Sequence, residues 1–109
     1  MSQYMMIVTT TARMQDASRI AERLVEQHLA GCVQIAGPML STYRWENEIQ
    51  RSEEYMVIIK SRADLYEQVE TAIKEIHPYE VPEIVGINVE AGSNEYLGWL
   101  AGELRKEQM

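Results

Sequence analysis

The pattern of apolar and polar positions along the chain switches between short apolar runs and stretches with helical spacing. Apolar, largely β-branched residues from Tyr4 to Thr10 predict a short buried strand. Asp16 is a candidate helix N-cap, and Gly31 tolerates the left-handed conformation that often ends a helix. Between them, one helical stripe contains Ala17, Ile20, Ala21, Leu24, Val25 and His28. We therefore expect a strand followed by an amphipathic helix.

A long hairpin is expected next. The segment from Cys32 to Trp45 reads as a second strand, kinked at Gly37-Pro38 because proline cannot donate a hydrogen bond within a sheet. Asn47 tolerates positive φ and supports a short turn, after which a third strand runs to Lys60. One face of this third strand carries Ile49, Tyr55, Val57 and Ile59. Each strand would extend about 40 Å, whereas a compact domain of this length has a radius of gyration near ~13 Å. The hairpin should therefore project from the domain.

The second half repeats the helix and strand pattern. Ser61 to Asp64 has the outline of a capping box, and Pro78 ends the helix that follows, because the residue before a proline leaves helical geometry. Residues 84–89 predict a fourth strand, and Asn94 is expected to cap a last helix. The core-facing positions are Leu65, Val69, Ile73 and Ile76 in one helix and Leu97, Leu100, Ala101 and Leu104 in the other. The βαββαβ order plus a C-terminal helix predicts an α+β, ferredoxin-like sandwich as a single domain over residues 1–109.

The projecting hairpin predicts self-association. Its apolar side chains are Leu40, Tyr43, Trp45, Tyr55 and Val57. A lone subunit has no surface long enough to cover them, and pairing with further copies in a closed ring does so most simply. Charges placed at Tyr55 and Val57 are therefore expected to weaken assembly.

Composition narrows the classes of partner. The chain has 109 residues, 46% of them hydrophobic and 25% charged, which is ordinary globular composition. A net charge of −7 opposes binding to a phosphate backbone, so no nucleic-acid partner is expected. No apolar run approaches the roughly 20 residues of a membrane span, so no membrane association is expected. The lone Cys32 and an N-terminus unlike a secretory signal predict a cytoplasmic protein.

Five segments, taken in order, are more specific than any periodicity. They are Leu29-Ala30-Gly31-Cys32-Val33, Tyr43-Arg44-Trp45-Glu46, Ile59-Lys60-Ser61-Arg62, His77-Pro78-Tyr79-Glu80-Val81-Pro82-Glu83-Ile84 and Tyr96-Leu97-Gly98-Trp99-Leu100. Together they resemble the CutA family, named for divalent-cation tolerance, over most of the chain. The resemblance implies a homotrimer assembled through the long hairpin, with a subunit similar to that of PII signal-transduction proteins. It also implies a protein responsive to metal ions that binds copper.

The resemblance directs attention to His77 as a metal ligand, with Glu80 and Glu83 offering carboxylate oxygens to Cu(II) or another divalent cation. The alternative is that His77 caps carbonyls at the helix C-terminus, where the helix dipole favours its positive form. His28 is expected to be a partly buried core or boundary residue rather than a ligand. The residues indicate no other cofactor.

A second candidate site is an intersubunit cleft formed by Arg44, Trp45, Lys60, Tyr79 and Trp99. Aromatic walls with two cations suit a small anion, which would make the protein a PII-like small-molecule sensor. The same residue types also favour protein interfaces, so they are equally consistent with anchors for a protein partner.

A third and more distant reading is an acylphosphatase-like hydrolase, which Arg13 and Asn47 superficially suggest. The loop after the first strand lacks the glycines that let backbone N–H groups cradle a phosphate. No nucleophile, base or paired-carboxylate arrangement is recognisable elsewhere. The sequence therefore predicts that the protein is not an enzyme.

Overall fold

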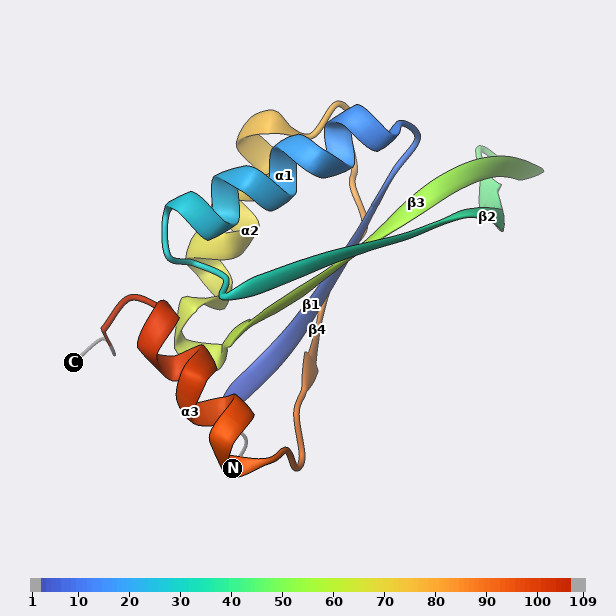
Figure 1. Ribbon diagram of the computed structural model, residues 1–109. Coiled ribbons are helices and arrows are strands. Elements are labelled where there is room, and N and C mark those ends of the chain that lie inside the picture. Colours follow the sequence, from blue (N-terminus) through green and yellow to red (C-terminus); the bar gives the residue numbers. More distant parts are fainter. Residues whose placement is uncertain (1–2, 107–109) are drawn as a thin grey trace.

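A computed structural model describes residues 3–106 as a four-stranded antiparallel sheet with helices α1 and α2 packed on one face (Figure 1). The elements are β1 (Tyr4–Thr11), α1 (Met14–Glu26), β2 (Cys32–Trp45), β3 (Glu48–Arg62), α2 (Tyr66–Ile76), β4 (Ile84–Asn88) and α3 (Asn94–Glu103). The strand order β2-β3-β1-β4 is that of the ferredoxin-like sandwich. The predicted α+β fold is confirmed, and the ends of the predicted 1–109 domain lie outside the described residues.

The hydrophobic core lies between the sheet and the two helices α1 and α2. Side chains alternate between the faces of a strand, and Ile7, Val57 and Ile59 on the helix-facing side are fully buried. The helices cover them with stripes of helical spacing. These stripes contain Ala17, Ile20 and Leu24 in α1 and Val69, Ala72 and Ile73 in α2. No helix within residues 3–106 is long and apolar enough to cross a membrane.

The ends of α1 differ from the prediction. The helix begins after Arg13 rather than at Asp16, and it ends at Glu26. His28, not Gly31, adopts the left-handed conformation, with φ of 58°. This places His28 outside the helical stripe, where it is exposed and its Nδ1 lies 2.9 Å from the Glu103 carbonyl oxygen. The expectation that His28 is a partly buried core or boundary residue was therefore wrong.

Two other predicted caps were also wrong. The Ser61 hydroxyl does not cap a helix, because it donates to the Leu29 carbonyl oxygen at 2.6 Å inside the molecule. Asp64 pairs with the buried Arg62 in the turn before α2. The last helix is capped by Ser93 rather than Asn94, since the Ser93 hydroxyl accepts from the Tyr96 backbone N–H at 3.2 Å. The partner of Ser61 is distant in the sequence, whereas Asp64 and Ser93 bond to residues two and three positions away.

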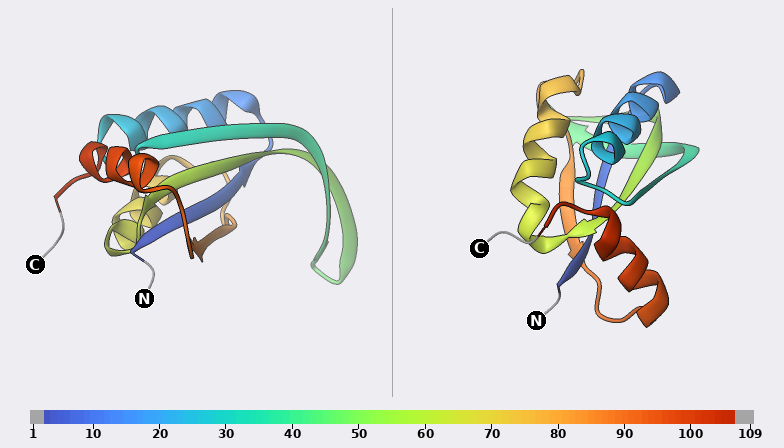
Figure 2. Two further views of the ribbon diagram at one scale, coloured as in Figure 1. Left: turned by 60° about the horizontal axis from the view of Figure 1, so that its bottom comes forward. Right: turned by 60° about the vertical axis from the view of Figure 1, so that its left-hand side comes forward.

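The hairpin of β2 and β3 projects beyond the helices and bends away from them (Figure 2). The pairing shifts register between Ala36 and Met39, as the Gly37-Pro38 kink predicted. Glu46 and Asn47 both have positive φ, of 50° and 67°, which defines a tight two-residue turn. The molecule measures 44 × 25 × 24 Å, with a radius of gyration of 14.5 Å. The predicted projection is confirmed.

The two faces of the sheet have different surroundings. Tyr55 and Val57 face the helices, with Val57 fully buried and Tyr55 packed against the core. The expectation that Val57 lies at a subunit interface was therefore wrong, while for the partly buried Tyr55 it stays a prediction. The opposite side, here called the open sheet face, carries the apolar residues Met6, Val8, Met56, Ile58, Val85 and Ile87. Neither α1 nor α2 covers this face (Figure 2).

Candidate functional site

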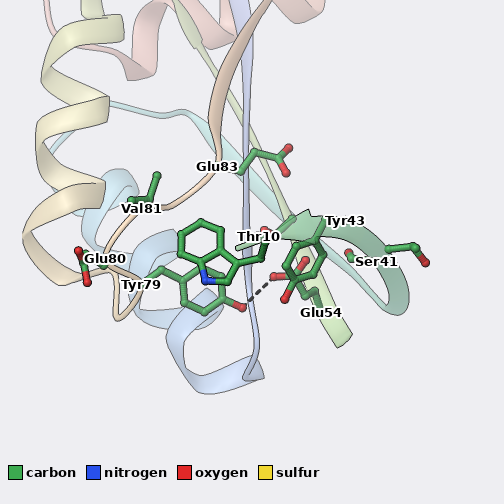
Figure 3. A pocket seen from close by; sticks show the side chains of 10 residues that line it. Thr10, Ser41, Tyr43, Glu54, Tyr79, Glu80, Val81 and Glu83 are labelled. Atoms are coloured by element: carbon green, nitrogen blue, oxygen red, sulfur yellow. Dashed lines mark hydrogen bonds between the residues drawn. The ribbon is translucent and has the colours of Figure 1, made fainter. Parts of the chain in front are cut away.

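A pocket of about 560 Å³ opens between the bent hairpin and the connector that follows α2 (Figure 3). Its walls come from the end of β1, from both hairpin strands and from the connector before β4. The residues that line it are Thr10, Ser41, Thr42, Tyr43, Trp45, Glu54, Tyr79, Glu80, Val81 and Glu83. Segments far apart in the sequence therefore meet at one concave surface.

Strand alternation decides which hairpin residues line the pocket. Tyr43 and Trp45 lie two positions apart on β2, so they point to the same side of the hairpin. Arg44 lies between them and points to the opposite side, paired with Ile49. Glu54 reaches the pocket from β3, where its neighbours Glu53 and Tyr55 point the other way. The pocket thus receives aromatic and acidic side chains but not Arg44.

His77 fixes the connector to β1. Its Nε2 lies 2.7 Å from the Thr10 carbonyl oxygen, and its Nδ1 accepts from the Tyr79 backbone N–H at 3.1 Å. Since a backbone N–H can only donate and a carbonyl can only accept, Nε2 carries the proton of this ring. The side chain is 8% exposed, and its ring lies 4.7 Å from that of Tyr79. Both ring nitrogens are therefore occupied by hydrogen bonds.

Tyr79 and Glu54 form the polar contact at the base of the pocket. The Tyr79 hydroxyl donates to Glu54 Oε2 at 2.8 Å, as the dashed line in Figure 3 marks. Burial, together with the adjacent Glu54 carboxylate, raises the pKa of the Tyr79 phenol well above its ordinary value. Glu54 itself is only 8% exposed. The phenol therefore stays neutral and donates to a largely buried carboxylate.

The predicted metal ligands lie near one another without forming a preassembled site. Glu80 and Glu83 are exposed on the pocket rim, whereas His77 is buried and bonded through both ring nitrogens. Within residues 3–106, no group of three or more His, Cys, Asp or Glu side chains is placed to hold a metal ion. Ligation by His77 would require one of its hydrogen bonds to break. Metal binding by these three residues stays a prediction.

The predicted anion cleft is divided within one subunit. Trp45 and Tyr79 line the pocket, but Lys60 pairs with Cys32 at the other end of the hairpin. There the Lys60 Nζ lies 3.0 Å from the Gln34 amide oxygen and 5.9 Å from the centre of the Tyr96 ring. Trp99 belongs to this second group, since its ring lies 5.7 Å from that of Tyr96. Whether subunits bring the two groups together stays a prediction.

The acylphosphatase-like pair is also separated. Arg13 follows the end of β1, whereas Asn47 lies in the turn at the far end of the hairpin (Figure 1).

The pocket residues that the sequence did not predict are Thr10, Ser41, Thr42, Glu54 and Val81. Of these, Glu54 has the clearest signal in the sequence. It is an acidic residue inside a strand, and its side chain points away from the side that the buried Val57 and the partly buried Tyr55 share.

Comparison with known proteins identifies the family. The family model described as CutA1 divalent ion tolerance protein matches residues 5–103. This chain belongs to the CutA1 family. A relative from Thermus thermophilus, named divalent-cation tolerance protein CutA, is 37% identical over 95 residues, covering 86% of this chain and 92% of the relative. Its name, like that of the family, describes a tolerance protein rather than an enzyme.

Solved CutA structures share the fold over nearly the whole chain. CutA1 from Shewanella sp. SIB1 is 36% identical, with a TM-score of 0.93 over 96% of this chain and 98% of that one. CutA from Archaeoglobus fulgidus, described as a periplasmic divalent cation tolerance protein, is 34% identical with a TM-score of 0.90, over 94% of this chain and 99% of that one. The resemblance drawn from the five sequence segments is confirmed.

Proposed function

We propose that this CutA1 family member acts in divalent-cation tolerance as a homotrimer in the cytoplasm. Family membership supports the tolerance role. The open sheet face supports assembly, and the number three follows from the resemblance to trimeric CutA proteins. The cytoplasmic location rests on the sequence, and because the Archaeoglobus relative is described as periplasmic, fractionation of cells is its check.

The open sheet face is the observation that carries the assembly proposal. Val85 and Ile87 are 45% and 51% exposed on this face, although both are strand residues with apolar neighbours. On the opposite side of the hairpin, Leu40 is 69% exposed and Ile49 is 58% exposed. Exposed apolar surface of this kind is unfavourable in water and usually marks an interface. Further copies of the same chain would cover it in a closed, symmetric arrangement.

A charge on the open face tests the assembly. Ile87→Asp should leave the fold intact, because the carboxylate reaches water in a lone subunit, but it should dissociate an assembly that buries this face. Val25→Asp is the matched control, since Val25 is 43% exposed on α1, on the other side of the sheet. Sedimentation should give a trimer for the parent and the control and a monomer for Ile87→Asp. A folded trimer of Ile87→Asp, or a monomeric parent, would contradict the proposal.

The tolerance role is tested in cells. A strain that lacks its own CutA1 family protein would be grown with increasing copper(II) chloride and complemented with this chain. We expect the parent chain to restore growth at metal concentrations that stop the uncomplemented strain. The Ile87→Asp variant, expressed to the same level, tests whether assembly is required for this growth. Equal growth of all strains would overturn the tolerance proposal.

Direct copper binding is a separate prediction, and the residues of a single subunit do not by themselves form a copper site. A site at His77 would need one broken hydrogen bond and further ligands from a neighbouring subunit. Calorimetry with Cu(II) on the parent, His77→Ala and His28→Ala tests it. If His77 is a ligand, the affinity for Cu(II) should fall only in His77→Ala. Equal affinity in all three would leave His77 with its hydrogen-bonding role alone.

A small-molecule sensor is the second candidate function, and the pocket between the hairpin and the connector is the observation that favours it. Its volume of about 560 Å³ falls in the range of roughly 300 to 1,000 Å³ that small-molecule sites occupy. Binding of a small molecule there, measured on the intact protein, would support this second role.

A further inference from the structure

We draw no further inference here: the strongest candidate, the pocket between the bent hairpin and the connector after α2, has a hairpin wall that belongs to the surface covered in the proposed homotrimer, and the described residues 3–106 do not show what lies against that wall after assembly.

Discussion

Gly31 shows how a residue can matter for the space it leaves rather than for its backbone conformation. A Cβ at this position would lie 2.5 Å from Leu100 Cδ1, and Leu100 is itself a buried core residue of α3. A side chain at this position would therefore require the end of the Leu100 side chain to shift, whereas the backbone of α3 lies at ordinary contact distance. The left-handed conformation that the sequence assigned to Gly31 belongs to His28.

His77 also has a role in the structure that differs from the one its residue type suggested. A histidine before a proline, with two glutamates following, suggests a metal ligand. In the structure its ring joins Thr10 of β1 to the backbone of Tyr79, and so it holds the connector that forms one wall of the pocket. The helix ends before His77, as Pro78 predicted, because His77 adopts extended geometry.

Tyr79 predicts a dependence of stability on alkaline pH. Its phenol pKa is raised by burial and by the Glu54 carboxylate, whereas in the unfolded chain it ionises near its ordinary value of 10.0. Above that pH the unfolded state loses a proton that the folded state keeps, so the free energy of unfolding should fall as pH rises. Tyr79→Phe removes this contribution and should show a shallower fall between about pH 9 and about pH 11.

Urea unfolding of both proteins across this interval measures the difference. Tyr66, whose pKa is also raised by burial, is present in both proteins and therefore cancels in the comparison. Parallel stability curves for the parent and Tyr79→Phe would show that the Tyr79 phenol ionises alike in the folded and unfolded states.

At the scale of elements, the two faces of the sheet separate folding from assembly. Val57 faces the helices and is fully buried, so Val57→Asp should abolish the folded state at any protein concentration by burying an unpaired carboxylate. Ile87→Asp, on the open sheet face, should retain native circular dichroism. Spectra of the two variants recorded side by side check this contrast. A folded, monomeric Val57→Asp would mean that the helix-facing side of β3 had been misassigned.

At the scale of the whole molecule, two apolar surfaces lack partners in one subunit. These are the open sheet face and the hairpin, whose projection beyond the helices gives the molecule its long dimension of 44 Å (Figure 2). If the subunits assemble through them, assembly stabilises the folded state by mass action. The melting temperature should therefore rise with protein concentration over a range of about 100-fold. Differential scanning calorimetry measures this, and a constant melting temperature with monomeric sedimentation would contradict it.

The sequence by itself determined the order of the elements and most of the core. Helical spacing and strand alternation are local properties, so the buried stripes of α1 and α2 and the kink at Gly37-Pro38 follow from neighbouring residues alone. Five short segments were enough to indicate the family, and the match of residues 5–103 to the family model confirms it.

Only the tertiary structure decided the role of Ser61 and the character of the pocket. Leu29 competes for the Ser61 hydroxyl, and this partner is distant in the sequence. The pairing register places Lys60 at the other end of the hairpin from Trp45. Glu54 meets Tyr79 only because the hairpin bends beside the connector. Side-chain grouping depends on register and curvature, which no local pattern along the chain contains.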